Sequence, residues 1–225
     1  ATRTRFDADE ASVERDGAGV FSEADYQTQR VESGETIVRA AFERALAHDW
    51  RLSLGAEAAY NMLEQRIALL EDSGAGPVPV PLPSANVLVE EERGEISFML
   101  AGPLTPRWRF EGGASAEASM LRQEGDTNAE TELAFLKPTL QLTRSIGARN
   151  QLRLRLYRDV GQLDFEDFVS AADIQNAVVN AGNPDLRPET SWRWEVEGDW
   201  RFGDDGALSL QLYRWAIDDA IDLVP

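Results

Sequence analysis

Apolar and polar residues alternate along much of this chain of 225 residues. In residues 151–158, Leu152, Leu154 and Leu156 are separated by polar side chains. In residues 191–202 one face carries Trp192, Trp194, Val196, Gly198, Trp200 and Phe202. The intervening positions of that segment are mostly charged. A period of two is typical of a β-strand with one apolar and one polar face. The pattern therefore predicts an all-β, antiparallel chain.

The same period recurs in other segments. Further strands are predicted near residues 50–62, 108–118, 136–143 and 208–213. Residues 21–46 are predicted to form one long strand with a bulge at residues 33–34. We expect about nine strands in total. Residues 35–72 are ambiguous, because their Ala, Leu, Glu and Arg are good helix formers. A helical interpretation stays open there, although residues 50–62 keep the strand period.

The predicted connections alternate in length. This is typical of an up-and-down sheet that has short turns at one end and long loops at the other. Short ones are expected near residues 47–49, 102–106, 146–149 and 203–206, the last being a hairpin signal. Long ones are expected near residues 7–19, 72–85, 123–131 and 159–190. The long connections and their flanks are rich in Asp and Glu, which predicts an acidic rim that attracts cations. The alternative is that these acidic groups only keep a large surface solvated.

Two architectures fit strands of this kind. A soluble sandwich or barrel would pack the apolar face on a core, whereas an outer-membrane barrel would turn it to lipid and the polar face to a wet lumen. Three observations favour the membrane barrel. The apolar faces contain many small residues, which would fill a core poorly. The opposite faces are densely charged. Aromatic residues lie near strand ends, as in an interfacial girdle; they are Trp50, Trp108, Phe110, Trp192, Trp194, Trp200, Phe202, Tyr213 and Trp215.

Composition narrows the functional classes. The chain has 22 basic and 40 acidic residues, a net charge of −18, which argues against a nucleic-acid partner. There is no Cys, and His48 is the single His, so thiolate chemistry and His-rich metal centres are excluded. No stretch approaches the ~18 apolar residues of a transmembrane helix. We expect no catalytic residues, no cofactor and no metal.

The segment before the tryptophan-rich strand resembles a family signature. Residues 182–191 read Gly-Asn-Pro-Asp-Leu-Arg-Pro-Glu-Thr-Ser. They closely resemble the barrel signature of TonB-dependent outer-membrane receptors, with Asn183, Pro184, Asp185, Leu186, Arg187, Pro188 and Glu189 as the matching residues. Physically it is a stiff loop, because each proline fixes its own φ and restricts its predecessor. The motif is expected to be a loop clamp rather than a ligand site.

The resemblance implies a transmembrane β-barrel of the Gram-negative outer membrane, with short periplasmic turns and long extracellular loops. It implies active uptake of a scarce nutrient, such as a ferric siderophore, cobalamin or an oligosaccharide, with outer-membrane lipid, a plug domain and TonB as partners. The arginines of the polar face would bind an anionic substrate or the plug, or else pair with carboxylates beside them. We find no plug pattern, no TonB box and no closing terminal strand, and about nine strands is far fewer than the roughly 22 of a plugged transporter. Residues 1–225 are therefore expected to form a partial barrel domain.

Two other classes of function remain open. One is a different outer-membrane barrel, either a passive pore or an adhesin; the signature argues against it. The other is a soluble carbohydrate-active β-protein that uses a carboxylate pair such as Glu195 and Glu197. Carboxylates two residues apart on a strand are usually a solvated face, so this class is disfavoured.

Overall fold

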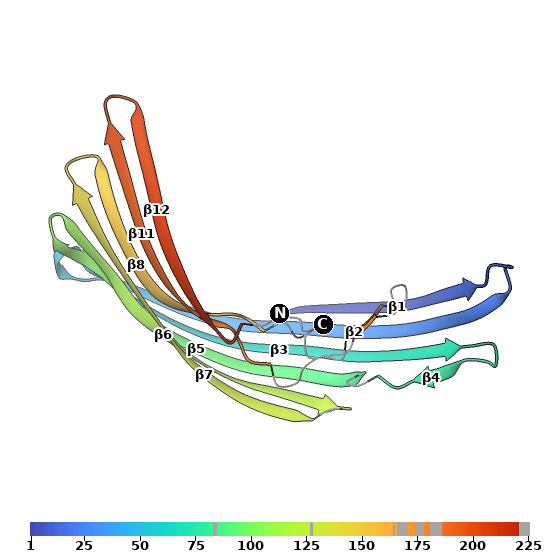
Figure 1. Ribbon diagram of the computed structural model, residues 1–225. Coiled ribbons are helices and arrows are strands. Elements are labelled where there is room, and N and C mark those ends of the chain that lie inside the picture. Colours follow the sequence, from blue (N-terminus) through green and yellow to red (C-terminus); the bar gives the residue numbers. More distant parts are fainter. Residues whose placement is uncertain are drawn as a thin grey trace.

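The computed structural model describes residues 1–82, 85–126, 128–163, 165, 171–173, 178–180 and 186–220. Within these ranges the chain is almost entirely β-strand (Figure 1). The strands are β1 (Thr2–Arg15), β2 (Phe21–Ala45), β3 (Arg51–Asp72), β4 (Val78–Val80), β5 (Asn86–Thr105), β6 (Trp108–Gly125), β7 (Ala129–Ile146), β8 (Asn150–Val160), β9 (Ala171–Asp173), β10 (Val178–Asn180), β11 (Thr190–Phe202) and β12 (Gly206–Asp218). A short 3₁₀ turn, η1 (Ala47–Asp49), joins β2 to β3. No helix in these ranges is long and apolar enough to cross a bilayer.

The strands form one antiparallel meander. The sheet order is β1-β2-β3-β5-β6-β7-β8-β11-β12, with β4 added beside β3, and β9 and β10 form a separate pair. This confirms the predicted all-β, up-and-down architecture and, along the main path, the expected strand number. The sheet is curved like part of a cylinder and does not close, because β1 and β12 are not paired with each other (Figure 1). The helical alternative for residues 35–72 is wrong, because β2 and β3 pair continuously there.

Several strands are far longer than a membrane requires. β2 has 25 residues and would span roughly 80 Å at about 3.3 Å per residue, against a hydrocarbon core of about 30 Å. Two predicted long connections are consequently wrong. Residues 7–15 belong to β1, and residues 123–131 lie largely in β6 and β7. Charge in these segments does not end the strand, because a strand with water on both faces needs no apolar period.

The predicted bulge at residues 33–34 is also wrong. Gly34 pairs in register with Arg3 on one side and Met62 on the other. The register of β1 with β2 shifts instead between Glu14 and Arg15.

The four connections that were predicted to be short all lie at one end of the sheet. They connect β2 to β3, β5 to β6, β7 to β8 and β11 to β12 (Figure 1). Gly147 and Gly203 turn the chain with φ of 67° and 60°. In η1 the non-glycine residues His48 and Asp49 take the same left-handed conformation. The remaining connections lie at the opposite end, where the links between β1 and β2 and between β6 and β7 are also short.

A small apolar cluster lies on the face of the sheet that carries Leu63, termed the concave face here. It consists of Leu63, Val87, Val89 and Leu121. Leu163, Phe165 and Leu186 of the connection between β8 and β11 pack against it. The described ends of that connection therefore fold back over the sheet.

Candidate functional site

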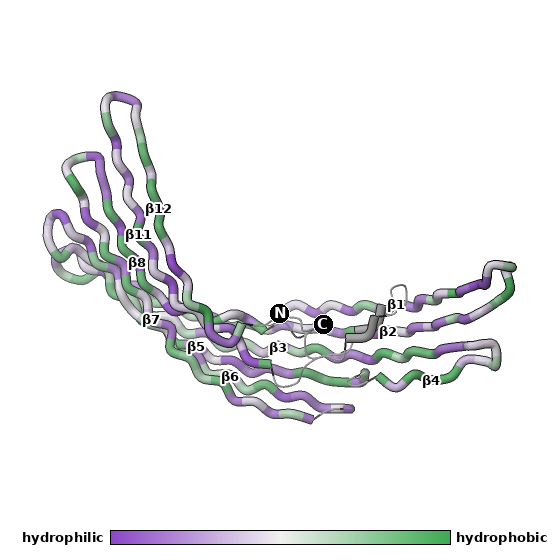
Figure 2. The backbone as a smooth tube through the Cα atoms, viewed as in Figure 1, coloured by the Kyte–Doolittle hydropathy of each residue, from purple (hydrophilic) through white to green (hydrophobic). Residues whose placement is uncertain are grey.

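The opposite, convex face is apolar over the half of the sheet that adjoins the short turns. Cross-strand register aligns Leu54, Phe98, Ala114 and Pro138 in one row of four strands. Figure 2 shows the alternation of hydrophobic and hydrophilic residues along these strands. Ile96, Leu136 and Leu212 on this face are 66%, 57% and 61% exposed. A continuous exposed apolar surface of this kind is typical of contact with lipid.

The apolar band has the height of a bilayer. In β5 the convex positions are apolar or Gly from Ile96 to Leu104. That stretch matches the roughly nine to eleven residues of a tilted membrane-spanning strand. Further from the short turns the same face of β5 carries Glu90 and Glu92. The band therefore ends within the strands, and their outer halves extend beyond it.

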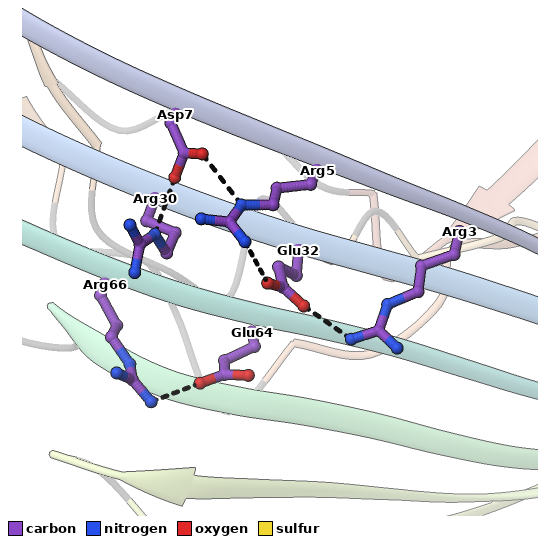
Figure 3. Close-up of polar contacts among 7 residues, drawn as sticks. All are labelled: Arg3, Arg5, Asp7, Arg30, Glu32, Glu64 and Arg66. Carbon is purple, nitrogen blue, oxygen red and sulfur yellow. Dashed lines mark hydrogen bonds and ion pairs between the residues drawn. The ribbon is translucent and has the colours of Figure 1, made fainter.

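A lattice of charges covers the convex face of β1–β3 beyond the band (Figure 3). Arg3 contacts Glu32 at 2.7 Å, and Asp7 accepts hydrogen bonds from Arg30 at 2.7 Å and Arg5 at 2.9 Å. On β3, Arg66 pairs with Glu64 at 2.7 Å. The hydrogen bonds from Arg30 and Arg5 lower the pKa of Asp7 below its ordinary value. Such charges are costly in hydrocarbon, so this part of the wall lies in water or among lipid headgroups.

Aromatic residues border the band on the convex face, as the predicted girdle requires, with two exceptions. Trp50, Trp108 and Phe202 lie close to the short turns, and Trp192 and Trp194 lie toward the other border of β11. The exceptions are Tyr213 and Trp215, which oppose Glu195 and Arg193 on the concave face. The Arg193 guanidinium lies 4.3 Å from the Trp215 ring centroid. Including these two residues in the girdle was wrong, because in β12 they alternate with the lipid-facing leucines.

Glycines on the convex face are covered by aromatic rings. A Cβ at Gly198 would lie 2.1 Å from Trp200, one at Gly102 would lie 2.3 Å from Trp50, and one at Gly112 would lie 2.5 Å from Phe110. Each ring therefore occupies the space beside a glycine where a side chain would otherwise lie, a known way of compensating for Gly in a strand. Some of the small residues of the convex face thus make room for aromatic rings.

The concave face is charged and paired. Arg153 contacts Glu197 at 2.6 Å, and Arg155 contacts Glu195 at 3.2 Å. On the neighbouring strands, Lys137 bridges Glu117 at 2.9 Å and Glu95. These pairs favour the predicted pairing of lumen arginines with carboxylates. They also argue against Glu195 and Glu197 as an acid–base pair, since each is held by a different arginine.

Only the second half of the signature loop, residues 186–189, lies among the described residues. Leu186 packs on the concave cluster, Pro188 is buried, and the Glu189 carbonyl accepts a hydrogen bond of 2.7 Å from the Gly161 amide. Arg187 is exposed. Asn183, Pro184 and Asp185 lie outside the described residues. The described half thus joins the two ends of the connection between β8 and β11.

Among the described residues the predicted acidic rim is only partly assembled, because Glu14 and Glu71 lie near Glu23 whereas other members are spread over both faces of the sheet. Glu91 faces Asn61, whereas Glu90 and Glu92 point to the opposite face. Asp7 is engaged by two arginines. Asp164, Glu166 and Asp167 lie outside the described residues. Across the part of the chain that the structure describes, no group of three or more acidic or His side chains is arranged to hold a metal ion.

Sequence reasoning missed the cavity on the concave face near the start of β1. Its polar lining includes Thr4, Ser33, Asn61 and Gln162. Asn61 is 9% exposed. A single Asn in an alternating strand gives no sign of burial, and Gln162 lies in a segment predicted only as loop. Cross-strand register would have brought Thr4 and Ser33 together, had the extent of β1 been recognised.

An antiparallel meander with an apolar, bilayer-high convex face and a charged, ion-paired concave face has the build of an outer-membrane β-barrel wall. The family model for "TonB dependent receptor-like, beta-barrel" matches residues 2–225. The chain therefore belongs to the TonB-dependent receptor barrel family, a family of outer-membrane receptors and transporters. No curated protein matches the chain.

Proposed function

We propose that this chain is part of the barrel of a receptor that takes up a scarce nutrient actively across the outer membrane of a Gram-negative bacterium. The observation that carries the proposal is the match of the receptor barrel family over residues 2–225. The bilayer-high apolar band supports a location in the outer membrane. The candidate nutrients are a ferric siderophore, cobalamin or an oligosaccharide.

The open sheet supports the further proposal that residues 1–225 are one segment of a larger closed barrel. β1 and β12 each present an unpaired edge, and unpaired edges are avoided in membrane barrels. Further strands would close the wall, a plug domain would fill the lumen, and TonB would supply the energy. The protein would bind and gate rather than catalyse.

Orientation follows from the position of the band. The short turns lie at the band's edge, whereas the charged strand halves extend beyond its other border. Membrane barrels keep short periplasmic turns and longer outer loops, so we place the turns in the periplasm and the connection between β8 and β11 outside the cell. The signature loop, residues 183–189, is then a clamp that fixes this connection to β11. Its support is the packing of Leu186 and the Gly161–Glu189 hydrogen bond.

Uptake and conductance together test the function against a passive pore. Cells that carry the full-length receptor should accumulate a labelled nutrient, and a protonophore should abolish the accumulation. The purified receptor in a planar bilayer should show no steady conductance, because the plug closes the lumen. Steady conductance, together with uptake that is insensitive to the protonophore, would establish a passive pore instead.

A further inference from the structure

The concave face holds a cavity of about 570 Å³ at mid-length of β2 and β3, between the apolar band and the outer end of the sheet. β1, β2 and β3 form its floor, and Gln162, Leu163 and Phe165 from the connection after β8 border it. The volume is within the ~300–1,000 Å³ of sites for small ligands. The cavity therefore lies on the side of the band that we place outside the cell. A ligand approaching the receptor would thus meet this cavity before the ion-paired part of the wall.

The lining of the cavity is polar but almost uncharged. Thr2, Thr4 and Ser33 contribute hydroxyl groups, and Asn61 and Gln162 contribute amides. Val31, Leu63, Leu163 and Phe165 add apolar surface. In the described part of the lining, Glu35 is the one charged residue, and no Lys or Arg is present. Anionic ligands need cationic partners, and a net charge of −18 would repel them further.

Asn61 gives the cavity an unused acceptor. Its side chain is nine-tenths buried, and its Nδ2 donates a hydrogen bond of 3.0 Å to Glu91 Oε2. Its Oδ1 accepts no hydrogen bond from the described residues. A buried carbonyl oxygen without a donor is unfavourable. Because Oδ1 has almost no exposed surface, a ligand hydroxyl group in the cavity would supply that donor once the Asn61 amide turns toward it.

We infer that this cavity is the binding site for an uncharged, hydroxyl-rich ligand of the oligosaccharide class. Hydroxyl and amide groups of the lining match sugar hydroxyls, and the Leu63–Leu163–Phe165 side accepts the apolar faces of sugar rings. This inference rests on the proposed receptor function and selects among its candidate nutrients. It disfavours an anionic ferric chelate as the cargo at this site.

Isothermal titration calorimetry on the purified full-length receptor in detergent tests the inference. The probes are maltohexaose, cellohexaose and xylohexaose, with ferric enterobactin as the anionic comparison. We expect saturable binding of at least one hexasaccharide and none of the ferric chelate. Thr4→Val removes one exposed hydroxyl at nearly constant shape and should weaken sugar binding about three- to tenfold, the effect of one hydrogen bond. Asn61→Leu should weaken it about tenfold or more.

Thr36→Val is the matched control, because Thr36 opposes Tyr60 on the convex face; it should leave affinity unchanged. Since Asn61 is buried, a misfolded Asn61→Leu receptor leaves Thr4→Val to decide. Sugar affinity that is unchanged in Thr4→Val and in folded Asn61→Leu would overturn the site. Binding of the ferric chelate instead of sugar, or of no probe at all, would overturn the ligand class. None of these outcomes affects protonophore-sensitive uptake, which tests the receptor function separately.

Discussion

Arg153 on β8 faces Glu197 on β11, with Arg153 Nη1 2.6 Å from Glu197 Oε2. One residue further along, Leu154 opposes Val196 on the other face of the same two strands. The environment thus changes from a charged lumen to lipid in a single step along the chain. The functional assignment depends on this alternation.

Leu154→Arg should destabilise the full-length receptor strongly. A charge near the bilayer midplane of a barrel costs roughly 2–4 kcal/mol. Arg153→Leu should cost no more than about 1 kcal/mol, because both members of its ion pair are partly exposed to the wet lumen. Urea unfolding in lipid vesicles measures both. Equal free energies of unfolding for the two variants would refute the assignment of the faces.

Gly198→Ala should destabilise the wall by roughly 1–3 kcal/mol, the usual cost of overpacking. The new Cβ would lie 2.1 Å from the Trp200 indole and would displace it. Gly94→Ala is the control on the same face, since nothing lies within 4 Å of its Cβ position. That variant should be neutral or slightly stabilising. If the same unfolding measurement gives both variants equal effects, the ring over Gly198 is not important for stability.

Glu23 and Glu71 should make the outer ends of β2 and β3 more stable in acid. A hydrogen bond with Glu71 and repulsion between the two carboxylates raise the pKa of Glu23 above its ordinary value. A carboxyl whose pKa is raised by folding contributes stability that is full below its unfolded pKa and is lost as pH rises through the folded pKa. Hydrogen exchange corrected for intrinsic rates should therefore show more protection at pH 4 than at pH 7 in residues 21–26 and 69–72.

Glu23→Gln should remove this dependence, since a neutral side chain cannot titrate. The effect of Asp7 on stability has the opposite pH dependence, because Arg30 and Arg5 lower the pKa of Asp7. Its contribution is full above the unfolded pKa and is lost as pH falls through the folded pKa. Protection of residues 21–26 that is the same at both pH values in the unmodified receptor would contradict the Glu23–Glu71 interaction.

This chain expressed alone should aggregate in buffer without detergent. Its convex face exposes large apolar side chains on most strands, and both edge strands are unpaired. Light scattering with and without a mild detergent measures the effect. A monodisperse monomer that unfolds cooperatively in plain buffer would favour the soluble sandwich.

Much of the fold was predictable because the lipid-facing and lumen-facing positions differ sharply in polarity. Leu152, Leu154 and Leu156 define a strand without any tertiary information. The signal fails in β1, where Arg5 and Asp7 lie on the convex face beyond the membrane and pair with Glu32 and Arg30. A strand with water on both faces has no apolar period, so its sequence is typical of a loop.

The ligand cavity could not be predicted for a different reason. It brings Thr4 on β1, Asn61 on β3 and Gln162 beyond β8 together. This requires the curl of the sheet and the return of the connection over its concave face. Packing of Phe165 on the Leu63 cluster fixes that return, and no local pattern encodes such a contact. Ion pairs such as Arg153–Glu197 were expected in kind, but their partners depend on register.

Topology labelling tests the central claim most directly. One epitope tag is inserted at Ala172, on β9 in the connection between β8 and β11, and another at Asp205, in the turn between β11 and β12. The two sites belong to connections at opposite ends of β11. In cells that carry the full-length receptor, antibody should reach the Ala172 tag on intact cells. It should reach the Asp205 tag only after the outer membrane is permeabilised. The reverse pattern would invert the orientation, and labelling of both tags on intact cells would contradict a membrane-spanning barrel wall.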